Sequence, residues 1–364
     1  GWPLVHRAFM GAGLTLYDLL GAAKDGGRAH HLSSGAVAEL IPNIKRDGLR
    51  GGVTYSDGVE DDARFSIAVA RTAVADGATL VTRARAVAVV TDATGAISGV
   101  RVRDLLGGNE LTVRSTKVID ATGVWLGHPE ARLGGSTMKL VPSRGTHLVF
   151  DRERLQLKTG MTLRVPGRVL FVIPQPGVWL VGTTDIGDEG APDRPVPTVD
   201  EVSEILDNVN AVLDLDLTRE DAVGAFAGLR PLVGAPGGDT ARVSREHTIH
   251  REASGLVRVS GGKYTTYRLM ARDAVDYVLD GEASAPRSLT ADRPLLGASP
   301  HEQLDSLASE LAADTDLEAT VMSALVERHG TQAREVVELG READLLRPLA
   351  DDRTELEAEV ACAV

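Results

Sequence analysis

The chain has 364 residues, of which 43% are hydrophobic and 25% charged, and its formal net charge at pH 7 is −13. This composition excludes global disorder, and the length allows about two domains. The acidic balance argues against nucleic acid as a partner, because binding a phosphate backbone needs an excess of Lys and Arg. The single cysteine, Cys362, excludes an intrachain disulfide framework. No apolar run approaches the roughly 18 residues that span a bilayer.

The first third of the chain predicts a mixture of helices and strands. Residues 1–50 are predicted to be helix and loop. Asp61-Asp62 marks the start of a helix that runs to Gly77, since acidic residues stabilise a helix N-terminus. Strands are predicted for three short runs rich in β-branched residues, at 79–82, 87–90 and 100–102. The turn residues Thr94-Gly95 between the last two favour a meander.

The rest of the chain predicts further strands and then a helical tail. Val118-Ile119 predicts a short buried strand that leads into Asp120-Ala121-Thr122-Gly123. Apolar runs predict three more strands, at 147–150, 169–173 and 178–181. Helices are predicted at 199–212 and 265–279, and residues 222–260 read as short strands between them.

Interleaved strands and helices followed by a helical tail predict an α/β fold of mixed α+β character with a small all-α domain. The composition shifts to Ala, Ser, Pro and Gly between residues 281 and 300. We therefore expect a core domain over residues 1–285 and a C-terminal helical domain over residues 286–364. Within the core, residues from about 140 to 255 are predicted to bind the substrate.

The most informative motif is Gly261-Gly262-Lys263, in which a strand runs into a helix that Thr265 or Thr266 can cap. Glycines let a backbone approach a ligand closely, and N–H groups at a helix start favour a negative charge or a carbonyl oxygen. Lys263 adds a cation at the same point. The alternative is a tight turn with an exposed lysine.

Two arginines accompany this motif, Arg230 before Pro231 in a strand-like stretch and Arg245 before Glu246. A planar guanidinium suits bidentate capture of a carboxylate or phosphate. With Lys263, the arginines predict one pocket for a small anion, which an acidic protein can bind where its basic residues converge. A structural salt bridge is the alternative for each arginine.

His147 is a candidate base, because its ordinary pKa suits it to take a proton from an alcohol near neutral pH. A satisfied core histidine is the alternative. Asp120-Ala121-Thr122-Gly123 is the kind of turn that a dinucleotide-binding domain places against its cofactor, and Gly182-Thr183-Thr184-Asp185 is similar. Polar β-turns are the alternative for both. The histidines do not cluster at metal-ligand spacings, so no metal site is predicted.

Eight motifs over residues 14–268 stand in one order: Leu14-Thr15-Leu16-Tyr17-Asp18, Tyr55-Ser56-Asp57-Gly58 with Asp61-Asp62-Ala63-Arg64, Asp120 to Trp125, Gly145-Thr146-His147, Gly182 to Asp185, Ala227 to Leu232, Ser244 to His247, and Gly261 to Arg268. In this order they resemble the FAD-dependent glycerol-3-phosphate dehydrogenases, within the D-amino-acid-oxidase-like flavoproteins. The tail also resembles that family's C-terminal domain, with Arg328-His329-Gly330 at a characteristic turn.

The resemblance implies that sn-glycerol 3-phosphate loses a hydride from C2 to FAD, giving dihydroxyacetone phosphate, and that the electrons pass to a quinone. It implies catalytic roles for His147, Arg230 and Lys263. The residues that it implies for substrate contacts are Arg230, Arg245, Lys263 and Tyr55. Those that it implies for FAD contacts are Ala86, Ala121, Thr122, Gly123, Gly261, Gly262, Lys263, Thr265 and Thr266. Either His147 or the arginine–lysine group takes the hydroxyl proton.

The family begins with a strand, a GxGxxG loop and a helix that hold the FAD pyrophosphate, and this sequence shows no such segment. We therefore expect an FAD-dependent oxidoreductase fold that lacks its first βαβ unit, in a chain truncated at both ends. A related flavoprotein oxidase that uses O₂ and a catalytically incomplete remnant are the alternatives. The resemblance implies a cytoplasmic location, with peripheral attachment at the inner face of a membrane, and leaves a homodimer open.

Overall fold

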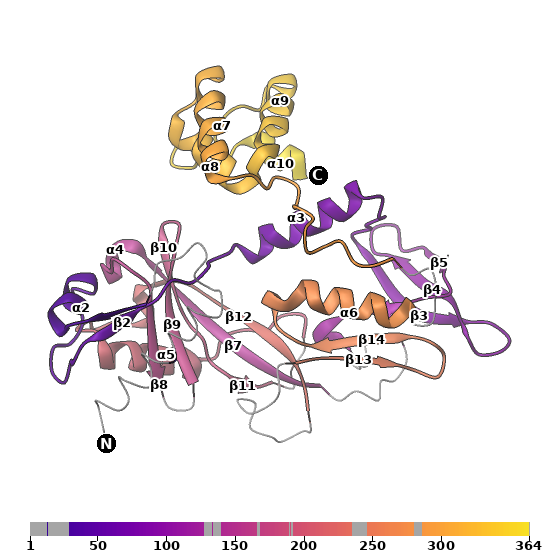
Figure 1. The fold of residues 1–364 in the computed structure, drawn as a ribbon, viewed down its shortest axis with the longest axis horizontal. Coiled ribbons are helices and arrows are strands. Elements are labelled where there is room, and N and C mark those ends of the chain that lie inside the picture. The colour runs from indigo at the N-terminus through magenta and orange to yellow at the C-terminus, as the bar shows by residue number, and fades with distance from the viewer. Residues whose placement is uncertain are drawn as a thin grey trace. The chain divides into compact units, whose positions relative to one another are not determined.

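The computed structural model describes residues 13, 29–126, 133, 140–165, 168–188, 190, 192–234, 246–279 and 286–363. Figure 1 shows the order of their helices and strands. Contacts divide the chain into two compact units. The first is formed by Gly1–Asp57 with Arg83–Pro286, and the second by Gly58–Thr82 with Arg287–Val364. The motif at residues 14–18 and the predicted anion ligand Arg245 lie outside the described residues.

A six-stranded antiparallel sheet carries the central part of the first unit. Its strands are β7 (Leu140–Asp151), β8 (Met161–Val165), β9 (Arg168–Gln175), β10 (Val178–Gly182), β11 (Ile186–Gly187) and β12 (Ala222–Val233). The order is β11-β7-β10-β9-β8, and β12 pairs with β7. The strands predicted at 147–150, 169–173 and 178–181 are confirmed as parts of β7, β9 and β10.

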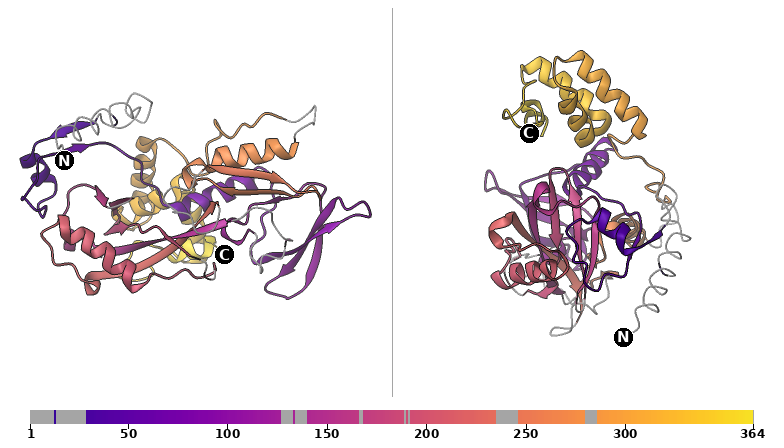
Figure 2. Two further views of the ribbon diagram at one scale, coloured as in Figure 1. Left: turned by 90° about the horizontal axis from the view of Figure 1, so that it is seen from below. Right: turned by 90° about the vertical axis from the view of Figure 1, so that its left-hand side faces the viewer.

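Alternation of side chains gives this sheet one packed face and one open face. Leu148 and Phe150 of β7 are fully buried and belong to a core cluster that includes Ile205 and Val209. Those two residues come from α5 (Val199–Val212), which confirms the predicted helix and lies along the packed face (Figures 1 and 2). His147 alternates with Leu148 and therefore points to the open face.

Three smaller sheets complete the first unit. They consist of β1 (His30–Leu32) with β2 (Gly52–Thr54), of β3 (Ala84–Thr91), β4 (Ile97–Asp104) and β5 (Glu110–Arg114), and of β13 (His247–Arg251), β14 (Val257–Gly261) and β6 (Ile119–Asp120). The meander predicted around Thr94-Gly95 is confirmed by β3 and β4. Among the described residues of this unit, the other α-helices are α2 (Ser34–Leu40), α4 (Arg152–Leu155) and α6 (Tyr267–Leu279). Helix α6 lies against β13 and β14 (Figure 1).

The prediction that Val118-Ile119 is buried was wrong. The strand exists as β6, but Ile119 is 37% exposed and its neighbour Asp120 is only 3% exposed. The apolar residues suggested burial from their type alone. The strand instead turns its acidic side chain inward, because a buried arginine on β14 pairs with it.

The second unit is helical. Its helices are α3 (Asp62–Ala75), α7 (His301–Asp314), α8 (Ala319–His329), α9 (Ala333–Ala343) and α10 (Glu357–Ala363). The start predicted for α3 is confirmed, since the Asp61 side chain accepts a hydrogen bond from the Arg64 amide. The strand predicted at 79–82 was wrong. Leu80 and Val81 are 60% and 66% exposed there. No strand of the described chain pairs with this segment, and β-branched residues form a strand only where a partner strand is present.

Candidate active site

His147 and Arg230 lie on the open face of the six-stranded sheet. The register pairs His147 of β7 with Gly182 of β10 and with Phe226 of β12, and it pairs Arg230 with Ser143. Opposed residues of an antiparallel pair share a face, as do alternate residues along one strand. The sheet therefore brings two of the predicted site residues together, although 83 positions separate them in the numbering of the chain.

Arg230 is held by the loop that follows β10. Its Nη1 and Nη2 both donate to the backbone carbonyl of Thr184, each at 3.3 Å, and Nη2 also donates to Thr183 Oγ1 at 3.1 Å. Ser143 Oγ accepts from Nη1 at 3.4 Å, and Asp185 Oδ1 lies 3.8 Å from Nη1. The side chain is still 28% exposed. The guanidinium thus has a fixed orientation and remains accessible, which suits bidentate capture of an anion.

His147 stacks on Phe226, with ring centroids 5.2 Å apart and ring planes 14° from parallel. Its Nδ1 is buried and has no hydrogen-bond partner among the described residues. Burial, and then the positive charge of Arg230, lower the pKa of His147 below its ordinary value of 6.5. The ring is therefore neutral at pH 7, which is the state that a general base requires.

Two glycines make room for these side chains. A Cβ built on Gly145 would collide with the Arg230 guanidinium, and one built on Gly182 would collide with the His147 ring. A larger residue at either position would displace a side chain of the site. Both glycines stand in motifs that the sequence singles out, but their contacts depend on the pairing of β7 with β10 and β12, which spacing alone does not reveal.

Two loops predicted to contact the cofactor follow two neighbouring strands at the same end of the small sheet. β6 and β14 run parallel, with Ile119 opposite Val257, so their carboxyl ends point the same way. Ala121-Thr122-Gly123 follows β6, and Gly261-Gly262 lies at the end of β14. Gly123, Gly261 and Gly262 have φ of 61°, 76° and 79°, a region that glycine adopts without strain.

A buried ion pair joins these two strands. Arg258 Nη1 donates to Asp120 Oδ2 at 2.6 Å, and its Nε donates to Glu252 Oε1 at 2.6 Å. The exposed fractions of Arg258 and Asp120 are 1% and 3%. Asp120 Oδ1 also accepts from the Thr122 amide at 3.1 Å and from its hydroxyl at 2.7 Å, which fixes the turn. The sequence reasoning missed Arg258, because nothing in its spacing links it to Asp120.

Lys263, Thr265 and Thr266 follow the glycines. Lys263 and Thr265 are exposed. The Thr266 hydroxyl donates to the Lys263 carbonyl at 2.9 Å and accepts from the Lys263 amide at 3.3 Å, so Thr266 closes the short turn Tyr264–Thr266 before α6. β12, which carries Arg230, contacts both β14 and the turn after β6. The strand that carries Arg230 thus lies beside the segments that carry the two loops.

Tyr55 and Ala86 lie apart from this group. The Tyr55 hydroxyl is 2.7 Å from Thr162 Oγ1 on β8, and β9 and β10 separate β8 from β7. Three strand spacings amount to about 14 Å. Thr162 is opposite Phe171 of β9, which is opposite Gly182, so Tyr55 stands at the far end of the row that contains His147. Ala86 lies on β3, in the three-stranded sheet.

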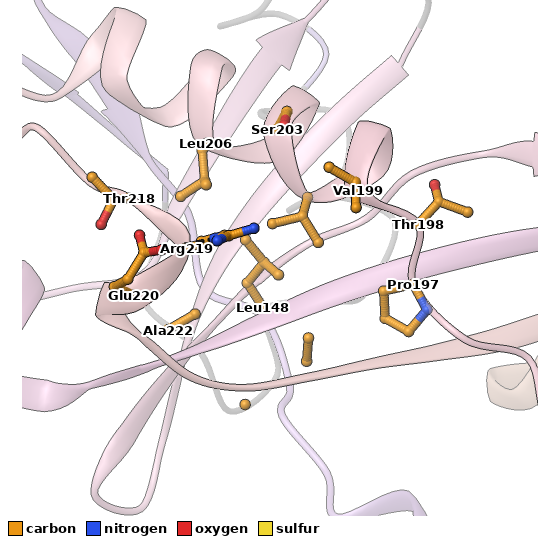
Figure 3. A pocket seen from close by; sticks show the side chains of 13 residues that line it. Leu148, Pro197, Thr198, Val199, Ser203, Leu206, Thr218, Arg219, Glu220 and Ala222 are labelled. Carbon is orange, nitrogen blue, oxygen red and sulfur yellow. Dashed lines mark hydrogen bonds and ion pairs between the residues drawn. The ribbon is translucent and has the colours of Figure 1, made fainter.

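A groove of about 520 Å³ lies elsewhere, between α5 and the N-terminal half of β12 (Figure 3). It is lined by Leu148 and by apolar side chains such as Val199 and Leu206, on the packed face of the sheet, and it contains none of the predicted site residues. Within the described residues, no three His, Cys, Asp or Glu side chains group to hold a metal ion. No described helix is long and apolar enough to cross a membrane.

The open sheet face thus carries an arginine and a neutral histidine, and the two glycine turns follow the neighbouring strands β6 and β14. Residues 7–276 match the family model described as FAD dependent oxidoreductase, and residues 288–364 match the one described as C-terminal domain of alpha-glycerophosphate oxidase. The chain belongs to the FAD-dependent oxidoreductase family. The predicted fold class and the prediction of FAD as cofactor are confirmed by these matches.

Individual relatives agree with the family. The chain is 38% identical to glycerol-3-phosphate dehydrogenase of Mycobacterium leprae (strain TN), over 99% of the chain and 62% of the relative. It is 33% identical to the mitochondrial glycerol-3-phosphate dehydrogenase of Arabidopsis thaliana, over 96% of the chain and 59% of the relative. The chain therefore spans less than two thirds of the length of these relatives.

A solved structure also resembles this one. The glycerol-3-phosphate dehydrogenase from Bacillus halodurans complexed with FAD superposes with a TM-score of 0.76 at 28% identity, covering 86% of this chain and 63% of that one. The resemblance to the glycerol-3-phosphate dehydrogenase family that the motifs indicated is confirmed by these relatives.

The described residues fit FAD in one respect, because the glycine turns after β6 and β14 let a ligand approach the backbone closely. Gly123, Gly261 and Gly262 have positive φ there. Of the predicted FAD contacts, Ala121, Thr122, Gly123, Gly261 and Gly262 lie in or beside these two turns.

Proposed function

We propose that this chain forms part of an FAD-dependent enzyme that oxidises sn-glycerol 3-phosphate to dihydroxyacetone phosphate and passes the electrons to a quinone. The observation that carries the proposal is the joint placement of Arg230 and His147 on one sheet face. A fixed guanidinium binds a phosphate, and a neutral histidine beside it removes a hydroxyl proton. The sequence identity between this chain and glycerol-3-phosphate dehydrogenases supports this choice of substrate.

In the proposed reaction, Arg230 orients the phosphate so that the C2 hydroxyl meets His147. The His147 ring accepts the hydroxyl proton, and Phe226 holds the ring in place by stacking. FAD, when bound, supplies the acceptor for the hydride that leaves C2. Arg245 and Lys263 remain predicted partners of the phosphate. Attachment at the inner face of a membrane and a homodimer are further parts of the proposal.

The test is a turnover assay with the FAD-loaded enzyme of which this chain forms part. We expect stoichiometric FAD, dihydroxyacetone phosphate as product, and reduction of a quinone analogue or dye without peroxide. A protein that holds FAD but oxidises only other hydroxy or amino acids would disprove the substrate assignment. A protein that holds no FAD under any condition would instead favour the catalytically incomplete remnant.

A second candidate is an oxidase of the same substrate, with O₂ as the acceptor. The match of residues 288–364 to the C-terminal domain of alpha-glycerophosphate oxidase favours it. The two candidates share the substrate pocket and differ in the fate of the electrons. Peroxide formed in proportion to product, with little dye reduction, would identify the oxidase.

A further inference from the structure

A carboxylate on the packed face of the six-stranded sheet connects to both site residues on the open face. Glu201, in the first turn of α5, is fully buried. Its Oε1 accepts hydrogen bonds from the hydroxyls of Thr146 at 3.0 Å and Thr184 at 2.8 Å. Its Oε2 accepts from Arg144 Nε at 3.0 Å and from the Thr198 hydroxyl at 2.8 Å. Each carboxylate oxygen therefore accepts at least two hydrogen bonds.

Capping of α5 explains only part of this arrangement. Thr198 and Glu201 form a capping box, in which each side chain bonds the backbone of the other residue. A capping glutamate normally stays at the surface. Burial by itself raises the pKa of Glu201, but the hydrogen bonds from Thr198, Thr184 and Thr146 outweigh burial and hold its pKa below the ordinary value of 4.5. The structure thus keeps a charged carboxylate beneath the site.

The two threonines that share Oε1 lie next to the site residues. The Thr184 carbonyl is the acceptor for both terminal nitrogens of Arg230, and Thr146 directly precedes His147 in β7. The Thr146 amide donates to the Thr184 hydroxyl at 2.9 Å, which joins the strand to the loop after β10. One oxygen of Glu201 therefore fixes the backbone on each side of the pocket.

We propose that Glu201, acting through the hydroxyls of Thr184 and Thr146, is the positioning residue that sets the orientation of Arg230 and the place of His147 for the anionic substrate. The substrate part of this inference rests on the proposed function. A guanidinium binds a phosphate bidentately only when its plane is correctly set, and the Thr184 carbonyl is what fixes that plane.

The test removes one hydroxyl from the network. Thr184→Val keeps the side-chain volume but loses the bonds to Glu201 and to the Thr146 amide. Because a hydrogen bond to a charged group is lost where the Arg230 acceptor is anchored, we expect KM for glycerol 3-phosphate and Kd for inorganic phosphate to rise about tenfold, with kcat changing less than about threefold. Thr184→Ser restores the hydroxyl and should restore both constants.

Thr198→Val is the matched control. It removes a hydrogen bond from the same carboxylate, but at Oε2, and leaves Thr146 and Thr184 bonded to Oε1. Both valine variants should lower the midpoint of thermal unfolding, and only the variant at Thr184 should weaken phosphate binding. Equal phosphate affinity in the two variants would show that the network is merely structural, and the positioning role would be wrong.

A readout that needs no turnover separates this inference from the proposed function. Displacing Arg230 weakens the effect of its positive charge on the His147 ring. The pKa of His147, measured by NMR titration, should therefore rise in Thr184→Val and stay unchanged in Thr198→Val. If the parent protein does not oxidise glycerol 3-phosphate but the titration moves as expected, the substrate assignment fails and the positioning role stands. An unmoved titration in Thr184→Val would overturn the positioning role even in an active enzyme.

Discussion

Replacing Arg230 by Gln tests the anion pocket directly. The change removes the positive charge and the planar fork while leaving a polar side chain near the Thr184 carbonyl. A charge-assisted hydrogen bond contributes about 1.5–3 kcal/mol, and truncating one partner of a desolvated charge pair costs about 2–5 kcal/mol. Since Arg230 is only 28% exposed, we take about 3–4 kcal/mol for the loss of a bidentate contact with phosphate. That corresponds to a loss of roughly 10²- to 10³-fold in kcat/KM.

The assay measures kcat/KM with a dye acceptor and the FAD content of the same preparation. Flavin content should stay at the parent level, because the proposed function assigns Arg230 to the substrate. Arg230→Lys keeps the charge without the fork and should lie between the parent and Arg230→Gln. Unchanged kinetics in Arg230→Gln would refute the assignment of Arg230 to the anion pocket. A loss of activity that only follows a loss of FAD would show that Arg230 supports cofactor binding rather than substrate binding.

The same variant makes a prediction about pH. The charge of Arg230 is the second cause of the lowered pKa of His147, after burial. In Arg230→Gln the pKa of His147 should therefore rise toward 6.5 but stay below it. A lowered histidine pKa stabilises the fold above the unfolded pKa of about 6.5, and that stability is lost as the pH falls from this value through the folded pKa. The variant should lose less stability than the parent over this range.

Three further predictions concern other parts of the chain. Gly262→Ala forces a side chain into a left-handed backbone and against Met270, so the fold should lose about 1–3 kcal/mol in denaturant titrations and FAD affinity should fall at least tenfold. Asp120→Asn leaves the buried Arg258 with less countercharge, and we expect a loss of about 3 kcal/mol in urea unfolding. Burial raises the pKa of Glu359, but hydrogen bonds from His329 and Arg328 outweigh burial and hold this pKa at about 2. Ionised Glu359 therefore stabilises the second unit above about pH 4.5, and this contribution is lost as the pH falls toward 2. Thermal unfolding should therefore show a deficit for Glu359→Gln near neutral pH that shrinks on acidification; a constant deficit would contradict the pKa.

Local chemistry is what the sequence could predict. The helix after Asp61 begins where an aspartate accepts a hydrogen bond from the amide three residues on, and this signal is complete within one turn. The strands of the large sheet were readable because their apolar runs are long and bounded by turns. Residues 79–82 show the limit: a β-branched run forms a strand only if another strand pairs with it, and the described chain offers none there.

The sequence predicted which residues form the site, but it did not predict how they are arranged in space. Arg230 and His147 were chosen for their chemistry, and their convergence depends on β12 pairing with β7, which no spacing encodes. Arg258 was missed for a related reason, since its partner Asp120 is 138 positions away. Tyr55, for which the resemblance implies a substrate contact, lies three strands from β7, and its role stays a prediction.

The two faces of the six-stranded sheet are therefore not independent. The open face holds the arginine and the histidine, and the packed face holds the carboxylate that fixes the backbone between them. The motif Thr-x-x-Glu at residues 198–201 reads as a capping box, and it is one. The same glutamate reaches Thr146 and Thr184 only because α5 lies along β7 at this point. A residue whose local role is to begin a helix thereby takes part in setting the substrate pocket, and a substitution that preserves the helix can still alter the site.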